Sequence, residues 1–103
     1  MILESIVYSA VFHYLKAIAA LDTHADGAAV VAKMKAMPTE DKLYGKGSIR
    51  EDGRKIHDMY LFEVKRPDEA KYPWDYLRVK ATIPAAQAWR PLDQGNCPLV
   101  KRS

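Results

Sequence analysis

The sequence predicts an α+β fold, in which two amino-terminal helices are followed by a three-stranded antiparallel meander and a short carboxy-terminal helix. Three observations lead to this prediction. Apolar residues recur at helical spacing from Leu3 to Leu21. The dipeptide Asp52-Gly53 is a strong hairpin signal, because Gly adopts a positive φ freely and Asp tolerates one. Segments in which polar and apolar residues alternate follow this turn, as expected of strands with two different faces.

Length and charge point to an ordinary soluble protein. The chain of 103 residues is 49% hydrophobic and 28% charged, which predicts one globular domain over residues 1–103. The net charge of +3 is small, and the charges alternate in sign without a block of Lys and Arg. We therefore interpret the charges as a solvated surface and predict no nucleic-acid partner.

The first predicted helix runs from about Leu3 to Leu21 and has a broad apolar face, with Ser9 and His13 near the edge of that face. Such a face needs more cover than one short hairpin offers. The second helix is expected at Ala28–Met37, with Asp26 as its N-cap and Pro38 ending it. The residues expected to point inward from this second helix are Val30, Val31, Met34 and Met37.

A polar loop is predicted for Thr39–Lys46, with Leu43 and Tyr44 as possible anchors. The strand after the Asp52-Gly53 turn is expected to be long, reaching Lys65, and to be largely covered on one face. A third strand is predicted at Tyr72–Ile83, a short helical turn at Ala85–Trp89, and an irregular tail at Pro91–Ser103.

The amino terminus raises the question of a signal peptide or a membrane span. It lacks a positively charged start, Glu4 stands where Lys or Arg is expected, and His13 and Lys16 interrupt the apolar run. We therefore predict an ordinary amphipathic helix, no membrane insertion, and a cytoplasmic location if the chain is expressed as written.

Residues that could carry chemistry are few. Cys97 could pair with His13, His24 or His57 as nucleophile and base, but no nucleophile-elbow or oxyanion-hole pattern surrounds it. The three histidines lack metal-ligand spacing, so we predict no catalytic residue, no metal and no cofactor.

A second candidate is an aromatic stretch that could stack on single-stranded nucleic acid, formed by Tyr72, Trp74 and Tyr76 with Arg78 and Lys80. The acidic neighbours Asp68, Glu69 and Asp75 argue against it, and aromatic residues on strands more often pack across the sheet.

Several short motifs carry a family resemblance. They occur in this order: Tyr8-Ser9-Ala10-Val11, Gly47-x-Ile49-Arg50-x-Asp52-Gly53-Arg54, His57-Asp58-Met59-Tyr60-Leu61, Glu63-Val64-Lys65-x-Pro67, Pro73-Trp74-Asp75-Tyr76, Ile83-Pro84 and Cys97-Pro98-Leu99-Val100. Together they resemble the carboxy-terminal portion of a periplasmic solute-binding protein that serves ABC transporters of branched-chain amino acids and similar small solutes.

This resemblance implies a partial lobe of the periplasmic-binding-protein fold, corresponding to about the carboxy-terminal third of a family member. Proteins of this family have a secretion signal and two α/β lobes, and they hold an amino acid or similar solute in the cleft between the lobes. Their partner is the transporter permease. The resemblance implies one ligand-binding candidate in this chain, Tyr8, whose alternative role is packing on the core at the start of a helix.

In a whole family member the first helix and the hairpin would pack on a sheet that has no counterpart here. Their apolar faces still need to be covered. Self-association covers them most simply, so we predict a homodimer. Two further hypotheses are an interaction module that completes separately encoded lobes and, less favoured, a binder of single-stranded nucleic acid.

Overall fold

The computed structural model describes residues 2–100, with side chains from Glu4 onward. Contacts within the chain divide it into two units, which we describe separately: residues 2–57 with 90–100 form the first unit, and Asp58–Trp89 form the second. The α+β class with small antiparallel sheets is confirmed, although the strands belong to two sheets and not to one meander.

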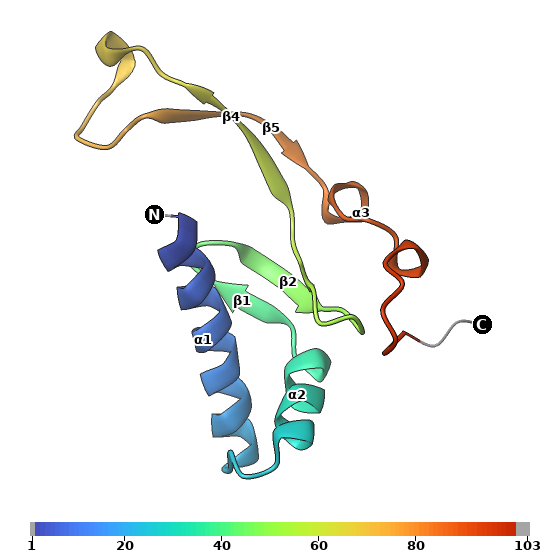
Figure 1. Cartoon of the computed structure of the whole chain (residues 1–103). Coiled ribbons are helices and arrows are strands. Elements are labelled where there is room, and N and C mark those ends of the chain that lie inside the picture. Colours follow the sequence, from blue (N-terminus) through green and yellow to red (C-terminus); the bar gives the residue numbers. More distant parts are fainter. Residues whose placement is uncertain (1, 101–103) are drawn as a thin grey trace. The chain divides into compact units, whose positions relative to one another are not determined.

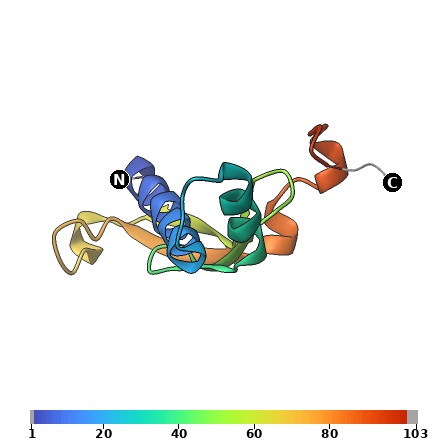
Figure 2. The same ribbon diagram turned by 90° about the horizontal axis from the view of Figure 1, so that it is seen from below.

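The first unit is a pair of helices on a small sheet (Figures 1 and 2). Helices α1 (Ile2–Leu21) and α2 (Gly27–Ala36) run in opposite directions, and Asp22 ends α1 with a left-handed φ of 54°. Strands β1 (Thr39–Asp41), β2 (Gly45–Ile49) and β3 (Lys55–Ile56) form an antiparallel sheet in that order. A short 3₁₀ turn, η2 (Leu92–Gln94), lies in the tail.

The second unit is a two-stranded ribbon. Strand β4 (Met59–Val64) pairs antiparallel with β5 (Leu77–Ile83), from Met59 opposite Ile83 to Val64 opposite Leu77, with a bulge at Leu61/Phe62. The 3₁₀ turn η1 (Pro67–Glu69) lies between the strands, and α3 (Ala85–Ala88) follows them. Every residue of β4 and β5 is exposed, so the ribbon by itself does not bury the strand face that the sequence predicts to be largely covered.

Local signals predicted several elements correctly. Helix α1 has the expected extent, and the Asp26 side chain accepts a hydrogen bond from the Ala29 backbone N–H at 3.2 Å, as an N-cap does. The hairpin turn is present, with Gly53 at φ 82°. The Gly53 N–H donates to the Arg50 carbonyl and the Arg50 N–H donates to the Arg54 carbonyl. This is a three-residue loop with Gly as its left-handed residue, so Asp52 needs no positive φ.

Three strand predictions are wrong. Thr39–Lys46 is not a loop, because β1 and the start of β2 lie within it. The long strand after the turn is interrupted at His57 and Asp58, where the chain passes from one unit to the other. The third strand begins only at Leu77, because Trp74 has a left-handed φ of 76° that a strand does not accommodate.

Helix α1 packs within the first unit through its polar side, and much of its predicted apolar face is exposed. The two polar residues expected at the edge of its apolar face, Ser9 and His13, are each only 4% exposed. The large apolar side chains on the other side of the helix are about half exposed: Val7, Val11, Tyr14 and Leu15. Among the described residues only Ala17 and Val30 are fully buried hydrophobic residues, so the chain has almost no apolar core of its own. Val31, expected to point inward from α2, is 50% exposed.

No helix in the described part of the chain is both long and apolar enough to cross a membrane.

Thr39 provides a first prediction about stability. Its side chain is 1% exposed and its hydroxyl oxygen has no hydrogen-bond partner among the described residues. Valine has the same shape without the hydroxyl, so Thr39→Val removes an unsatisfied polar group. We expect it to raise the free energy of unfolding by about 1 kcal/mol in urea titrations. The exposed Thr82 is the control, since Thr82→Val removes no buried polar group. A loss of stability in Thr39→Val would contradict the prediction.

Candidate functional site

A shallow hollow of about 430 Å³ lies in the first unit between the start of α1 and the turn that joins β1 to β2. Its lining residues are Glu4, Ser5, Tyr8, Lys42 and Leu43. The Tyr8 ring is 46% exposed and stacks on Phe12, with ring centroids 5.7 Å apart. Tyr8, the predicted ligand-binding residue, therefore lies on the wall of a hollow and not within a core.

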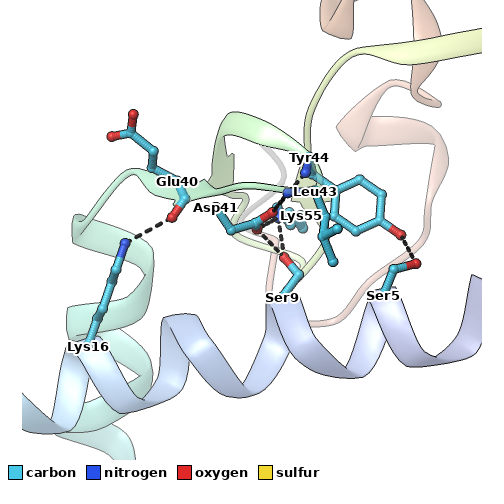
Figure 3. A network of polar contacts seen from close by, with 8 residues as sticks. All are labelled: Ser5, Ser9, Lys16, Glu40, Asp41, Leu43, Tyr44 and Lys55. Carbon is cyan, nitrogen blue, oxygen red and sulfur yellow. Dashed lines mark hydrogen bonds and ion pairs between the residues drawn. The ribbon is translucent and has the colours of Figure 1, made fainter.

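Asp41 fixes the turn on one side of this hollow (Figure 3). Its Oδ1 accepts hydrogen bonds from the backbone N–H groups of Leu43 at 2.8 Å and Tyr44 at 2.7 Å. Gly45 then takes a left-handed φ of 65° at the start of β2. The turn that carries Lys42 and Leu43 is thus held by a side chain as well as by the strand ladder.

The other oxygen of Asp41 ties the turn to α1 and β3. Oδ2 accepts hydrogen bonds from Ser9 Oγ at 2.6 Å and from Lys55 Nζ at 2.9 Å, and Lys55 Nζ also donates to Ser9 Oγ. Figure 3 shows Ser9, Asp41 and Lys55 converging at this point. Burial raises the pKa of Asp41, but the hydrogen bonds from Ser9, Lys55 and the two backbone N–H groups outweigh burial and hold the pKa well below its ordinary value of 3.8.

Tyr44 connects the same cluster back to the hollow. Its hydroxyl lies 3.2 Å from Ser5 Oγ, and Lys55 Nζ lies 4.8 Å from the centre of its ring. The His57 ring packs against the Tyr44 ring, with the ring centroids 4.8 Å apart. We call Ser5, Ser9, Asp41, Tyr44 and Lys55 the polar cluster; its hydrogen bonds hold the turn that carries Lys42 and Leu43 against α1.

These groups suit binding more than chemical conversion. The hollow combines an aromatic ring and a leucine with a serine hydroxyl and with one carboxylate and one ammonium group. An amphipathic small molecule could place its apolar part on Tyr8 and Leu43 and its polar groups on the rest. Within residues 2–100 no group of three or more His, Cys, Asp and Glu side chains could hold a metal ion.

The other residues considered for catalysis or nucleic-acid binding lie outside the hollow. His13 Nε2 bonds the Met34 carbonyl at 2.8 Å and is buried between the two helices. Cys97 is a free, half-buried cysteine in the tail. In the second unit, Arg78 pairs with Glu69 at 2.6 Å and Lys80 pairs with Glu63 at 3.1 Å. The two cations considered for nucleic-acid stacking thus already have carboxylate partners.

Comparison with known proteins identifies the family. A family model described as "Periplasmic binding protein" matches residues 3–71, which is most of the first unit and strand β4. The chain belongs to the periplasmic binding protein family. The resemblance found from the sequence motifs is therefore confirmed, and the match begins at α1 and includes the whole polar cluster.

Two solved structures show how much of such a protein the chain represents. A periplasmic binding protein from Burkholderia mallei is 49% identical, with a TM-score of 0.83, over 91% of this chain and 24% of that one. A branched chain amino acid ABC transporter periplasmic ligand-binding protein from Burkholderia xenovorans LB400 is 39% identical, with a TM-score of 0.81, over 89% of this chain and 24% of that one. The chain spans about a quarter of the length of these relatives. A search of curated protein sequences found no significant match.

The sequence alone predicted only part of this site. Tyr8 was found through the family motif, whereas Ser5, Lys42 and Leu43 were not candidates for binding. Asp41 had a usable signal, since an Asp side chain commonly accepts a hydrogen bond from the backbone N–H two residues on and so favours a turn. No sequence signal could predict that Asp41 bonds Ser9 and Lys55, because those residues are 32 and 14 positions away in the sequence.

Proposed function

We propose that this chain forms part of the substrate-binding component of an ABC transporter for amino acids or similar small solutes, and that it binds its solute without converting it. The observation that carries this proposal is the family match, which covers α1 and the turn that together line the hollow. The name of the Burkholderia xenovorans relative supports branched-chain amino acids as the solute class and an ABC transporter as the partner.

Tyr8 is the ligand-binding residue in this proposal. Its half-exposed ring offers an apolar platform, and Ser5 on the same wall offers a hydroxyl. The hollow is shallow and open, so it covers a solute on one side only. A ligand site normally encloses most of its ligand, so we expect the chain alone to bind weakly or not at all.

The test uses a chimaera in which this whole chain replaces the matching quarter of the Burkholderia xenovorans protein. Leucine, isoleucine, valine and phenylalanine are titrated by calorimetry into the chimaera and into the chain alone. We expect binding by the chimaera and about a tenfold loss of affinity in Tyr8→Ala, as removal of one aromatic contact predicts.

Two variants make this test specific. Tyr8→Phe keeps the ring and separates its contribution from that of the hydroxyl. Tyr72→Ala removes an exposed tyrosine of the second unit and should leave affinity unchanged. Equal affinity in Tyr8→Ala and the unchanged chimaera would refute the role of Tyr8, and a folded chimaera that binds none of the four amino acids would refute the solute class.

The homodimer stays a prediction. It is supported by exposed apolar residues on both strands of the second unit, since a two-stranded ribbon by itself is marginally stable. Light scattering over a tenfold range of concentration measures the mass of the chain in solution. A stable dimer would favour an interaction module, and a stable monomer would favour the solute-binding reading.

A further inference from the structure

The hairpin tip between β2 and β3 contains Asp52 followed directly by Gly53, a pair that can rearrange without any partner except water. The glycine nitrogen attacks the side-chain carboxyl carbon of the aspartate and forms a C–N bond. The carboxyl hydroxyl and the amide proton leave together as one water molecule. The resulting five-membered succinimide takes up one water and opens either to Asp or to isoaspartate. Glycine has no side chain to obstruct the attack, so such a pair is a modification site unless the fold prevents ring closure.

The Arg50 side chain holds the carboxyl group that would be attacked. Its Nε donates to Asp52 Oδ1 at 3.0 Å and a terminal nitrogen donates to Oδ2 at 2.7 Å; we call these two bonds the arginine fork. The other terminal nitrogen donates to the Arg90 carbonyl at 2.9 Å, which fixes the guanidinium group from the other side. The Arg54 backbone N–H also donates to Asp52 Oδ1, at 3.2 Å. Rotation of the carboxyl carbon toward the Gly53 nitrogen would break these bonds.

The attacking nitrogen is engaged as well. The Gly53 N–H donates to the Arg50 carbonyl at 2.9 Å, so the proton that must leave is held inside the turn. Ionisation is a further obstacle, because a carboxylate is a poor target for a nucleophile. The hydrogen bonds from the Arg50 side chain and the Arg54 N–H lower the pKa of Asp52 to about 2. Near neutral pH the reactive neutral acid is therefore at least about tenfold rarer than in an ordinary Asp.

We propose that Asp52-Gly53 is a latent site of isoaspartate formation, which the arginine fork keeps unreacted in the folded chain. Isoaspartate would add one carbon atom to the main chain at position 52 and shorten the arm that carries the carboxylate. The two-oxygen fork and the bonds that close the loop between Arg50 and Arg54 could then not re-form in the same register. Strand β3 follows this loop and supplies Lys55 to the polar cluster, so the change would reach the turn at Asp41.

A second Asp-Gly pair in the same chain serves as an internal reference. Asp26 precedes Gly27 at the start of α2, is exposed, and accepts a hydrogen bond from the Ala29 N–H at 3.2 Å. No arginine fork holds it in the described part of the chain. Loss of the fork at the hairpin should therefore change the rate at Asp52 and leave the rate at Asp26 as it was, whereas general unfolding would change both.

The test follows isoaspartate in the whole chain and in two variants, Arg50→Gln and Arg54→Gln. The samples are incubated in slightly acid buffer below their unfolding transitions, and circular dichroism verifies the fold. Enzymatic methylation measures isoaspartate and peptide mass spectrometry locates it. We expect Arg50→Gln to raise the rate at Asp52 by about tenfold or more. Arg54→Gln removes a neighbouring cation but keeps the backbone N–H, so it should change that rate by less than about threefold.

Two further samples keep the test decisive. Arg50→Lys retains the charge without a planar fork and should also raise the rate at Asp52, by a smaller factor, even if Arg50→Gln does not fold. The unchanged chain in urea should react at Asp52 at least as fast as either variant. Equal rates at Asp52 in the folded unchanged chain and in a folded Arg50 variant would overturn the proposal. Equal rates with and without urea, or the same rise at Asp26 as at Asp52 in the Arg50 variants, would overturn it too. None of these measurements involves a solute, so the result is independent of the binding proposal.

Discussion

Gly47→Ala is expected to destabilise the first unit by about 3 kcal/mol, enough to abolish its cooperative unfolding transition. A Cβ at position 47 would overlap the Ile56 carbonyl oxygen and approach Thr39 Oγ1 to 2.8 Å. The carbonyl is backbone of β3 and cannot turn away as a side chain would. Strand β3 must therefore move, and Lys55 must leave Asp41 with it. Thermal unfolding followed by circular dichroism measures the effect.

Gly27→Ala is the matched control for this substitution. Gly27 begins α2, and a Cβ there meets no atom within 4 Å. Alanine should be neutral or stabilise the helix by about 0.5 kcal/mol, because it restricts the unfolded chain. Equal transitions for Gly47→Ala and the unchanged chain would mean that β2 and β3 are not as closely paired as described.

Asp41→Asn has the second large expected effect, a loss of about 3 kcal/mol at neutral pH in urea unfolding. Asp41 accepts four hydrogen bonds, and its side chain is 3% exposed. The substitution leaves the Lys55 ammonium group without its anionic partner. Lys55→Met is the comparison, because it removes one of the four donors and leaves Asp41 with Ser9 and two backbone N–H groups. We expect it to destabilise less than Asp41→Asn; the reverse order would contradict the central role of Asp41.

The pH dependence of stability follows from the same carboxyl group. The pKa of Asp41 is lower in the folded than in the unfolded chain, where it is near 3.8, so the unfolded chain binds more protons in acid. Its contribution is complete above about pH 5 and is lost as the pH falls from about 4 toward 2. Asp41→Asn should flatten this part of the stability curve. A smaller slope should persist, because the hydrogen bond from Arg50 lowers the pKa of Asp52 to about 2.

The sequence predicted those features that depend on near neighbours. The extent of α1 follows from apolar spacing, the start of α2 from Asp26, and the hairpin turn from Gly53. The orientation of α1 could not be predicted in this way. Periodicity tells which side of a helix is apolar, but not whether that side faces its own unit or another polypeptide. The sequence predicts that the apolar face that includes Val11 needs more cover than one hairpin offers, but it does not predict which side of α1 packs within the unit.

Two other failures have local causes. The loop predicted for Thr39–Lys46 follows from the polar character of that stretch after Pro38, and the partners of Asp41, Ser9 and Lys55, are distant in the sequence. The third strand was started too early because alternation at Trp74 and Tyr76 resembles a strand. The backbone at Trp74 is left-handed, and Asp75 is held by the Lys65 ammonium group at 2.7 Å. The family motif located Tyr8, but the hollow around it is a product of the turn at Asp41.

The polar cluster also has a consequence for how the chain is made. Ser9 and Lys55 are separated by 46 positions. A ribosome adding about 5–20 residues per second takes roughly 2–9 s to synthesise that interval. Until Lys55 is made, the inner side of α1 lacks its final partners, and the apolar residues Val7, Val11 and Leu15 on its other side are exposed. Newly made α1 therefore waits for its partners, and the polar cluster cannot form before Lys55 is made. A chaperone that binds apolar segments has those seconds in which to engage it.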